Sequence, residues 1–221
     1  MTLRAVASDP GASNVQIRWL GCAEYEPTWR DMQSFTDTRT DADADQLWFL
    51  AHPPVFTLGM NGKHEHVLAP GDIPLVQIDR GGQVTYHGPG QLVVYPLIDV
   101  RRLGIGVRDL VVALENAVIA FCAERNVTAL GRRDAPGVYV NERKLASIGL
   151  RIRRGCSYHG LALNVSMNLE PFRRINPCGL AGLQVTDLEA QGIALSVQDA
   201  ARQLAPHLLR ELGLSDASTW V

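Results

Sequence analysis

Short apolar stretches separated by turn residues dominate the pattern of this chain. Alternating or continuously apolar runs predict strands at 15–20, 46–51, 55–58, 75–78, 91–96, 137–140, 144–153 and 158–165. Leu110, Leu114, Val118 and Phe121 recur at helical spacing and predict a helix over 107–125. A shorter stripe predicts an amphipathic helix over 26–38. Strands therefore outnumber helices.

The C-terminal third contains two candidate helix starts and one helix breaker. Thr186 with Glu189, and Ser196 with Asp199, have the spacing of N-terminal capping residues. The last predicted helix, 197–212, contains Pro206, which should bend or break it. The whole pattern favours an α/β or α+β fold: a single domain whose mixed β-sheet is flanked by helices. Because composition is even along the chain, we predict one domain over 15–221 after a flexible tail at 1–14.

Composition and charge exclude several classes of protein. The 221 residues are 46% hydrophobic and 20% charged, which is ordinary for a globular chain. A formal net charge of −2 and the lack of a basic stripe argue against nucleic-acid binding. No apolar run is long enough for a membrane helix, and residues 1–12 lack the apolar core of a secretory signal. We expect a cytoplasmic protein.

Cysteine and lysine usage narrows the candidate chemistry. The four cysteines lie at 22, 122, 156 and 178 without a Cys-x-x-Cys pair, which argues against a zinc site and a disulfide scaffold. His64 and His66 could share a metal by spacing, but no third ligand is evident. Only Lys63 and Lys144 are lysines, and every other basic residue is arginine or histidine. A desolvated lysine can act as a base where arginine cannot, although chance also explains a lone Lys144.

Three stretches could carry a binding or catalytic site. The segment 80–91 has four glycines, which suits a ligand lying against the backbone, or else a hairpin with tight turns. On the strand 144–153, periodicity alone predicts that Lys144 points outward into solvent. Cys178 lies in a turn between Pro177 and Gly179 and is the best candidate nucleophile, although most free cysteines are inert. Cys22 and Cys122 suit packing, and Cys156, in a polar turn, is a second candidate reactive thiol.

Four motifs in order resemble the lipoyl(octanoyl) transferases, the octanoyl-[acyl-carrier-protein]:protein N-octanoyltransferases of lipoate synthesis. They are RGGQVTYHGPGQ at 80–91, KLASIG at 144–149, YHGLALNV at 158–165 and INPCG at 175–179. The resemblance extends from Trp19 to about Leu188. It implies the fold of the biotin and lipoate protein ligase catalytic domains.

The resemblance also implies an activity. The enzyme would transfer octanoate from octanoyl-acyl carrier protein to a lysine of lipoyl domains, through an octanoyl-Cys178 thioester. This is the first step of endogenous lipoate synthesis. Acceptors would be the lipoyl domains of 2-oxoacid dehydrogenases and the glycine cleavage H protein. A monomer without metal or cofactor is expected.

Cys178 and Lys144 are the catalytic residues that the resemblance implies. A Lys144 ammonium would favour the thiolate, and a neutral Lys144 would take a proton from the acceptor amine. The implied substrate-binding residues, which would line an acyl channel, are Arg80, Gly81, Gly82, Gln83, Val84, Thr85, Tyr86, His87, Ser147, Ile148, Gly149, His159, Gly160, Leu161 and Ala162. Among them, His87 and His159 would orient the carbonyl or the incoming amine.

Three other functions compete with octanoyl transfer. An ATP-dependent lipoate or biotin ligase shares the fold, but the chain lacks a glycine-rich phosphate loop with a committed lysine. A non-catalytic carrier-protein-binding module would leave Cys178 structural. A cysteine hydrolase would release free octanoate. Arginine clusters at 132–133, 151–154 and 173–174 could dock an acidic carrier protein or could be solvated surface.

Overall fold

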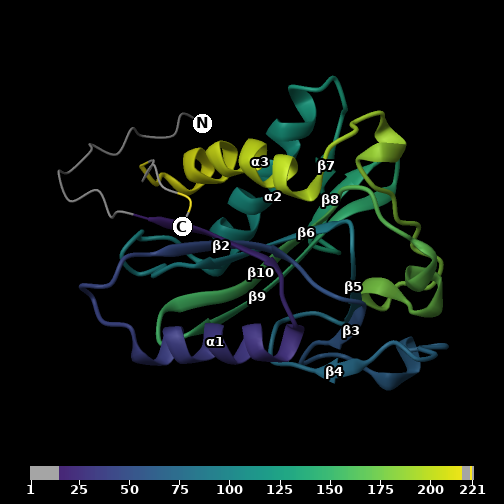
Figure 1. Cartoon of the computed structure of the whole chain (residues 1–221), viewed down its shortest axis with the longest axis horizontal. Helices are drawn as coiled ribbons and strands as arrows, with labels where there is room; N and C mark the ends of the chain where they lie inside the picture. Colours follow the sequence, from purple (N-terminus) through teal and green to yellow (C-terminus); the bar gives the residue numbers. More distant parts are fainter. Residues whose placement is uncertain (1–14, 216–219, 221) are drawn as a thin grey trace.

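A seven-stranded mixed sheet forms the centre of the molecule (Figure 1). The computed structural model describes residues 15–215 and 220. Only the β1–β2 pair is parallel, and the other neighbours are antiparallel. In spatial order the strands are β1 (Gln16–Cys22), β2 (Gln46–Ala51), β6 (Gln91–Leu97), β10 (Cys156–Asn164), β9 (Arg143–Arg153), β8 (Gly137–Val140) and β7 (Leu130–Gly131).

A second, three-stranded sheet lies at one end of the large sheet, at the lower right of Figure 1. Its order is β4 (Leu75–Gln77), β3 (Val55–Leu58) and β5 (Val84–His87). Phe56, Leu58, Val84 and Tyr86 pack with Phe172 in a small core of its own. Because β5 leads directly into β6, this sheet brings the glycine-rich segment 80–91 against the large one.

Helices cover both faces of the large sheet (Figure 1). On one face, α2 (Val107–Ala123) and α3 (Val197–Leu212) pack on each other and on the main apolar core. On the other, α1 (Tyr25–Thr38) packs through Met32 on a smaller core that includes Trp48 and Tyr158. Four 3-10 turns complete the described part: η1 (His64–His66), η2 (Glu170–Arg174), η3 (Pro177–Gly179) and η4 (Glu189–Gln191).

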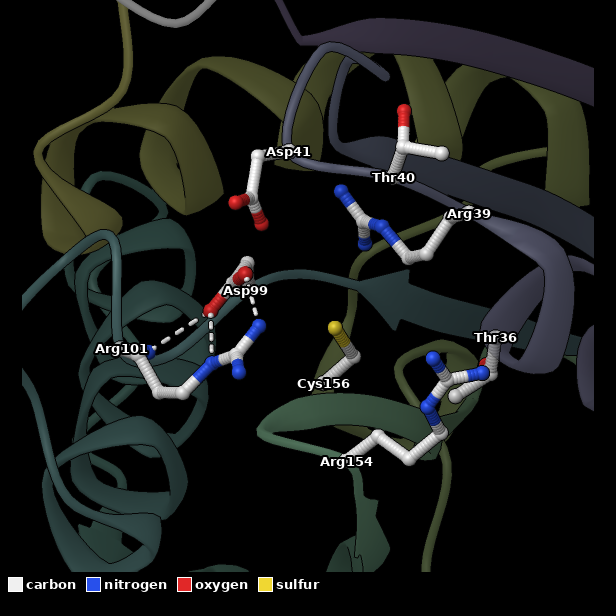
Figure 2. A pocket seen from close by; sticks show the side chains of 8 residues that line it. All are labelled: Thr36, Arg39, Thr40, Asp41, Asp99, Arg101, Arg154 and Cys156. Carbon is white, nitrogen blue, oxygen red and sulfur yellow. Dashed lines mark hydrogen bonds and ion pairs between the residues drawn. The ribbon is translucent and has the colours of Figure 1, made fainter.

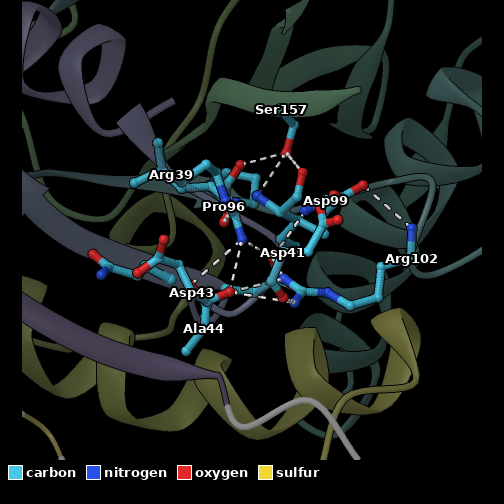
Figure 3. A network of polar contacts seen from close by, with 12 residues as sticks. Arg39, Asp41, Asp43, Ala44, Pro96, Asp99, Arg102 and Ser157 are labelled. Carbon is cyan, nitrogen blue, oxygen red and sulfur yellow. Dashed lines mark hydrogen bonds and ion pairs between the residues drawn. The ribbon is translucent and has the colours of Figure 1, made fainter. Parts of the chain in front are cut away.

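A buried network of polar contacts joins the loop that precedes β2 to the loop that follows β6 (Figure 3). The Asp45 carboxylate is fully buried, and its Oδ1 accepts hydrogen bonds from Arg39 at 2.8 Å, Arg102 at 2.8 Å and the Asp99 backbone N–H at 2.8 Å. Arg39 also donates to the Leu97 carbonyl at 3.0 Å. Two guanidinium groups thus compensate the burial of one carboxylate. The network joins the loops at this end of the sheet to one another.

The predicted single mixed α/β domain agrees with this architecture, and the predicted strands and long helices are present with end shifts of a few residues. Ser196 caps α3 as expected, because its Oγ accepts from the Asp199 N–H at 3.0 Å. The helix start predicted at Thr186 is wrong, because only the short turn η4 follows it. The Thr186 hydroxyl instead accepts a hydrogen bond from the Gln191 side-chain amide at 2.8 Å. The predicted break at Pro206 is also wrong.

Helix α3 runs through Pro206 without interruption. Proline removes one intrahelical N–H donor, but the flanking Leu204 and Leu208 are fully buried in the main core. Tertiary packing therefore overrides the local penalty. The predicted tail at 1–14 lies outside the described residues, and none of the described helices is long and apolar enough to span a bilayer. The cytoplasmic location stays a prediction.

Candidate active site

The sequence-predicted site residues come together around one narrow cavity of about 60 Å³, between β5, β9, β10 and the turn η3. Its lining contains both predicted catalytic residues and all the predicted binding residues but one: Arg80, Gly81, Gly82, Gln83, Val84, Thr85, His87, Lys144, Ser147, Ile148, Gly149, His159, Gly160, Leu161, Ala162 and Cys178. Tyr86 is the exception. It packs outside the cavity on Phe56 and Phe172, at ring distances of 5.5 Å each.

Two facing glycines form part of the cavity wall. Gly149 on β9 pairs directly with Gly160 on β10. A Cβ at Gly149 would lie 3.2 Å from Arg80 Cδ, and one at Gly160 would lie 2.2 Å from the Val94 carbonyl oxygen. The space at this point therefore depends on two positions without side chains.

Lys144 points inward, so the outward orientation predicted from strand alternation is wrong. Its side chain is 2% exposed, and Nζ donates to Cys178 Sγ at 2.8 Å and to the Pro136 carbonyl at 3.0 Å. The pairing of β8 with β9 shifts register beside this residue. The segment after Cys178 also pairs with the backbone of β9 at this residue: Lys144 N–H donates to the Gln184 carbonyl at 2.8 Å, and Thr186 N–H donates to the Lys144 carbonyl at 3.0 Å.

Cys178 occupies a strained turn. Its backbone has φ 59° and ψ 14°, in the left-handed region that non-glycine residues rarely adopt. The following Gly179, at φ 73°, continues the same turn. Strain at a residue that also contacts a buried lysine is typical of a functional site.

Burial dominates the environment of two other cysteines, although arginines lie near both. Burial raises the pKa of Cys122 to about 11 and also raises the pKa of Cys156, so both favour the thiol form. Cys22 is exposed, contrary to the packing role predicted for it. Cys178 instead has the Lys144 amine nitrogen at 2.8 Å inside the cavity, which makes it the best nucleophile on geometry.

Arg80 adds a buried positive charge to the cavity. Its Nη2 donates to the carbonyl and hydroxyl oxygens of Thr57 at 2.7 and 2.9 Å, and its Nη1 donates to Gly81 at 3.0 Å. Nε has no hydrogen-bond partner within 15–215 or at 220. Burial lowers the pKa of Arg80, while negative charge at Tyr25 or Cys178 would raise it. Arg80 and Cys178 both line the cavity.

Hydrogen bonds fix the tautomers of the two cavity histidines. Gln91 Nε2 donates to Tyr86 O and Asn164 Oδ1, so its Oε1 must accept from His87 Nδ1, at 2.8 Å. Burial lowers the pKa of His87 well below its ordinary value, which leaves Nε2 as an acceptor. His159 has φ 56°, and its Nε2 lies 2.8 Å from an oxygen of Asp79.

Asp79 is a site residue that the sequence reasoning missed. Its carboxylate accepts from Trp29 at 2.9 Å, Gln33 at 3.1 Å, His159 and the Tyr158 hydroxyl. These bonds, above all the one from His159, hold the pKa of Asp79 well below its ordinary value against the effect of burial. Asp79 directly precedes the motif that begins at Arg80, and this position was a local signal for a site residue. Its four hydrogen-bond donors lie on α1 and β10, which are distant in sequence.

A second, more open depression lies at the β9–β10 turn and shares no lining residue with the catalytic cavity (Figure 2). Its volume is about 410 Å³. Arg101 is held by Asp99 at 2.8 Å, and charged side chains of both signs line the depression. In the part of the chain that the structure describes, no cluster of three or more His, Cys, Asp or Glu side chains could hold a metal.

Comparisons with known proteins show the family of this chain. Residues 24–209 match the family described as the lipoyl protein ligase A/B catalytic domain. The chain is 58% identical to an octanoyltransferase from a Shewanella species, over 91% of this chain and 93% of that protein. It is 56% identical to an octanoyltransferase from Pseudomonas syringae pv. tomato, over 94% and 95%.

Solved structures show the same fold at low sequence identity. Lipoate-protein ligase A, solved with ATP, superposes with a TM-score of 0.77 at 14% identity, covering 94% of this chain and 89% of that one. A bipartite lipoate protein ligase from Thermoplasma acidophilum gives 0.71 at 15% identity, covering 94% and 88%. The biotin protein ligase of Aquifex aeolicus gives 0.52 at 11% identity, covering 90% and 69%.

Proposed function

The chain belongs to the lipoyl protein ligase A/B catalytic-domain family, and we propose that its octanoyl transfer runs through a thioester on Cys178 with Lys144 as the proton carrier. It is an acyltransferase that carries out octanoyl transfer in lipoate biosynthesis. Its acceptors are lipoyl-domain proteins. We further propose acyl carrier protein as the octanoyl donor and the H protein of glycine cleavage among the acceptors.

The first half-reaction transfers the acyl group to the enzyme. Cys178 thiolate attacks the carbonyl carbon of the donor thioester, a carbon–sulfur bond to the enzyme forms, and the bond to the donor sulfur breaks. The leaving thiolate takes a proton from the Lys144 ammonium. The products are octanoyl-Cys178, a free donor thiol and neutral Lys144.

The second half-reaction transfers the acyl group to the acceptor. A lysine amine of the lipoyl domain, having lost one proton to water, attacks the octanoyl thioester. Neutral Lys144 takes the second proton as the amide forms, and Cys178 leaves as the thiolate. Both catalytic residues thus return to their starting protonation states.

The observation that carries this proposal is the 2.8 Å contact between Lys144 Nζ and Cys178 Sγ inside a cavity lined by the motif residues. A single group must donate a proton in one step and accept one in the next, and a buried lysine can do both. Arginine at the same place could donate hydrogen bonds but could not give up its proton.

Intact-mass measurement without ATP or acceptor tests the route. Wild type mixed with octanoyl-acyl carrier protein should gain one octanoyl group, and Cys178→Ser should gain no thioester. Lys144→Arg should transfer to a lipoyl domain about 10²- to 10⁴-fold more slowly, the range usual for loss of a general base. Cys156→Ser is the matched control and should behave like wild type.

Two results would overturn the proposal. If transfer required ATP and free octanoate, the chain would act as a ligase, and the thioester route would be wrong. If wild type gained no octanoyl group while transfer to the acceptor still proceeded, catalysis would be direct and Cys178 would not be acylated.

A further inference from the structure

A buried carboxylate on α2 is linked to the catalytic lysine through one peptide group. Glu115 is 8% exposed, and its Oε1 accepts from the Gly137 N–H at 2.8 Å. The carbonyl of the same peptide, that of Pro136, accepts from Lys144 Nζ at 3.0 Å. A continuous hydrogen-bond chain therefore runs from Glu115 through the 136–137 peptide to Lys144 and on to Cys178.

The hydrogen-bond chain requires a glycine at position 137. Its φ is +142°, and a Cβ there would lie 2.3 Å from the Ala146 carbonyl oxygen and 2.7 Å from Lys144 Cε. Only a residue without a side chain allows the peptide to lie between the carboxylate and the lysine stem. Hydrogen bonds in series also polarise one another, so a carboxylate on the N–H makes the carbonyl a stronger acceptor.

We propose that Glu115 is a positioning residue, which stabilises the Lys144 ammonium through the Pro136–Gly137 peptide and thereby makes Lys144 a stronger base once Cys178 is acylated. The inference rests on the proposed function. In resting enzyme the thiolate balances the ammonium. In the acyl-enzyme that charge is gone, and Glu115 is the remaining buried anion of the relay.

The electrostatics of the site support this arrangement. Burial raises the pKa of Glu115, while the Gly137 N–H and the Lys144 ammonium oppose that shift. The other titratable or charged groups that face the relay are Cys178 on η3, Tyr139 on β8, whose ring centre lies 5.4 Å from Nζ, and Arg80 in the loop before β5. Burial raises the pKa of Tyr139 far above neutrality, so this phenol stays neutral during turnover.

The test is the pH dependence of single-turnover transfer from preformed octanoyl-enzyme to a lipoyl domain. Glu115→Gln keeps an acceptor for the Gly137 N–H but removes the charge. Its rate–pH midpoint should move to lower pH by on the order of one unit, the effect of a nearby charge at intermediate dielectric. Glu115→Asp, which keeps the charge, should retain a midpoint closer to that of wild type.

Two controls separate this effect from damage to the site. Glu142→Gln makes the same substitution at a nearby carboxylate whose side chain is 89% exposed, and should leave the midpoint unchanged. Hydroxylamine, an amine already neutral at pH 7, should cleave wild-type and Glu115→Gln octanoyl-enzyme at equal rates. Equal cleavage with a shifted transfer midpoint supports the relay.

Failure of this inference is distinguishable from failure of the proposed function. If octanoyl-enzyme forms and the Glu115→Gln midpoint equals that of wild type, Glu115 does not act on Lys144. If the shift is the same in Glu142→Gln, the effect is general surface charge and the relay is wrong. If wild type forms no octanoyl-enzyme, the thioester route itself fails.

Discussion

Acid should weaken the fold through His52, a buried histidine next to the cavity. Its Nδ1 donates to the Ala23 carbonyl at 2.6 Å, and its Nε2 accepts from the Tyr95 hydroxyl at 2.7 Å. The ring also lies edge-on to His87, at 5.9 Å. These contacts fit a neutral imidazole.

The size of this acid destabilisation follows from the difference between the pKa of His52 in the folded and in the unfolded protein. Burial lowers the pKa of His52 from 6.5 to about 4. Since the folded-state pKa is depressed, its contribution is fully present above pH 6.5 and is lost as the pH falls toward 4. Between pH 8 and pH 5 the loss is about 2 kcal/mol, and it reaches about 3 kcal/mol below pH 4.

Urea unfolding at several pH values measures this contribution directly. His52→Gln should be less stable than wild type at pH 8, because the hydrogen bonds of the imidazole are lost. Between pH 8 and pH 5, however, it should lose about 2 kcal/mol less than wild type does. His64→Gln, at an exposed histidine, should follow the wild-type curve. Parallel pH curves for wild type and His52→Gln would refute the reasoning.

Three further predictions concern the site and its surroundings. Gly137→Ala should displace Lys144 and slow acyl-enzyme formation by about 10²-fold, as seen in burst kinetics, and an unchanged burst would contradict the close packing described here. Asp79→Asn should lower the free energy of unfolding by about 2 kcal/mol in urea titration, because charge-assisted hydrogen bonds are lost, and full retention of stability would count against that network. If Arg173 helps to dock an acidic donor, Arg173→Glu should raise the donor KM in a salt-dependent way more than Arg174→Glu, whose guanidinium is already paired with Glu170 at 2.8 Å; equal effects would remove the docking role.

Sequence reasoning identified most of the cavity because its residues occur in four short motifs. It could not place Lys144, because strand alternation does not show that the distant Cys178 thiol and the Pro136 carbonyl contact this side chain. Tyr86 lies inside a motif yet packs in the small core, since membership of a motif does not fix which way a side chain points.

Glu115 and Pro206 show two different limits. A faint signal for Glu115 was present: it lies four residues after Val111 and three before Val118, on the apolar stripe of α2, where a charge is unexpected. Its partner, Gly137, is distant in sequence and could not be found from periodicity. Pro206 carried a strong local signal, which the packing of α3 on the main core overrides.

The contact between Lys144 and Cys178 sets a limit on the lifetime of the intermediate. When Cys178 carries the acyl group, neutral Lys144 is itself an amine close to a thioester, and nothing in the chemistry distinguishes its nucleophilicity from that of the acceptor. The hydrogen bond from Nζ to the Pro136 carbonyl holds the amine to one side of the thioester, and a protonated Lys144 cannot attack because it has no free electron pair. An acyl-enzyme stranded without acceptor should therefore inactivate itself slowly, by moving its octanoyl group onto Lys144 as an amide that hydroxylamine does not cleave.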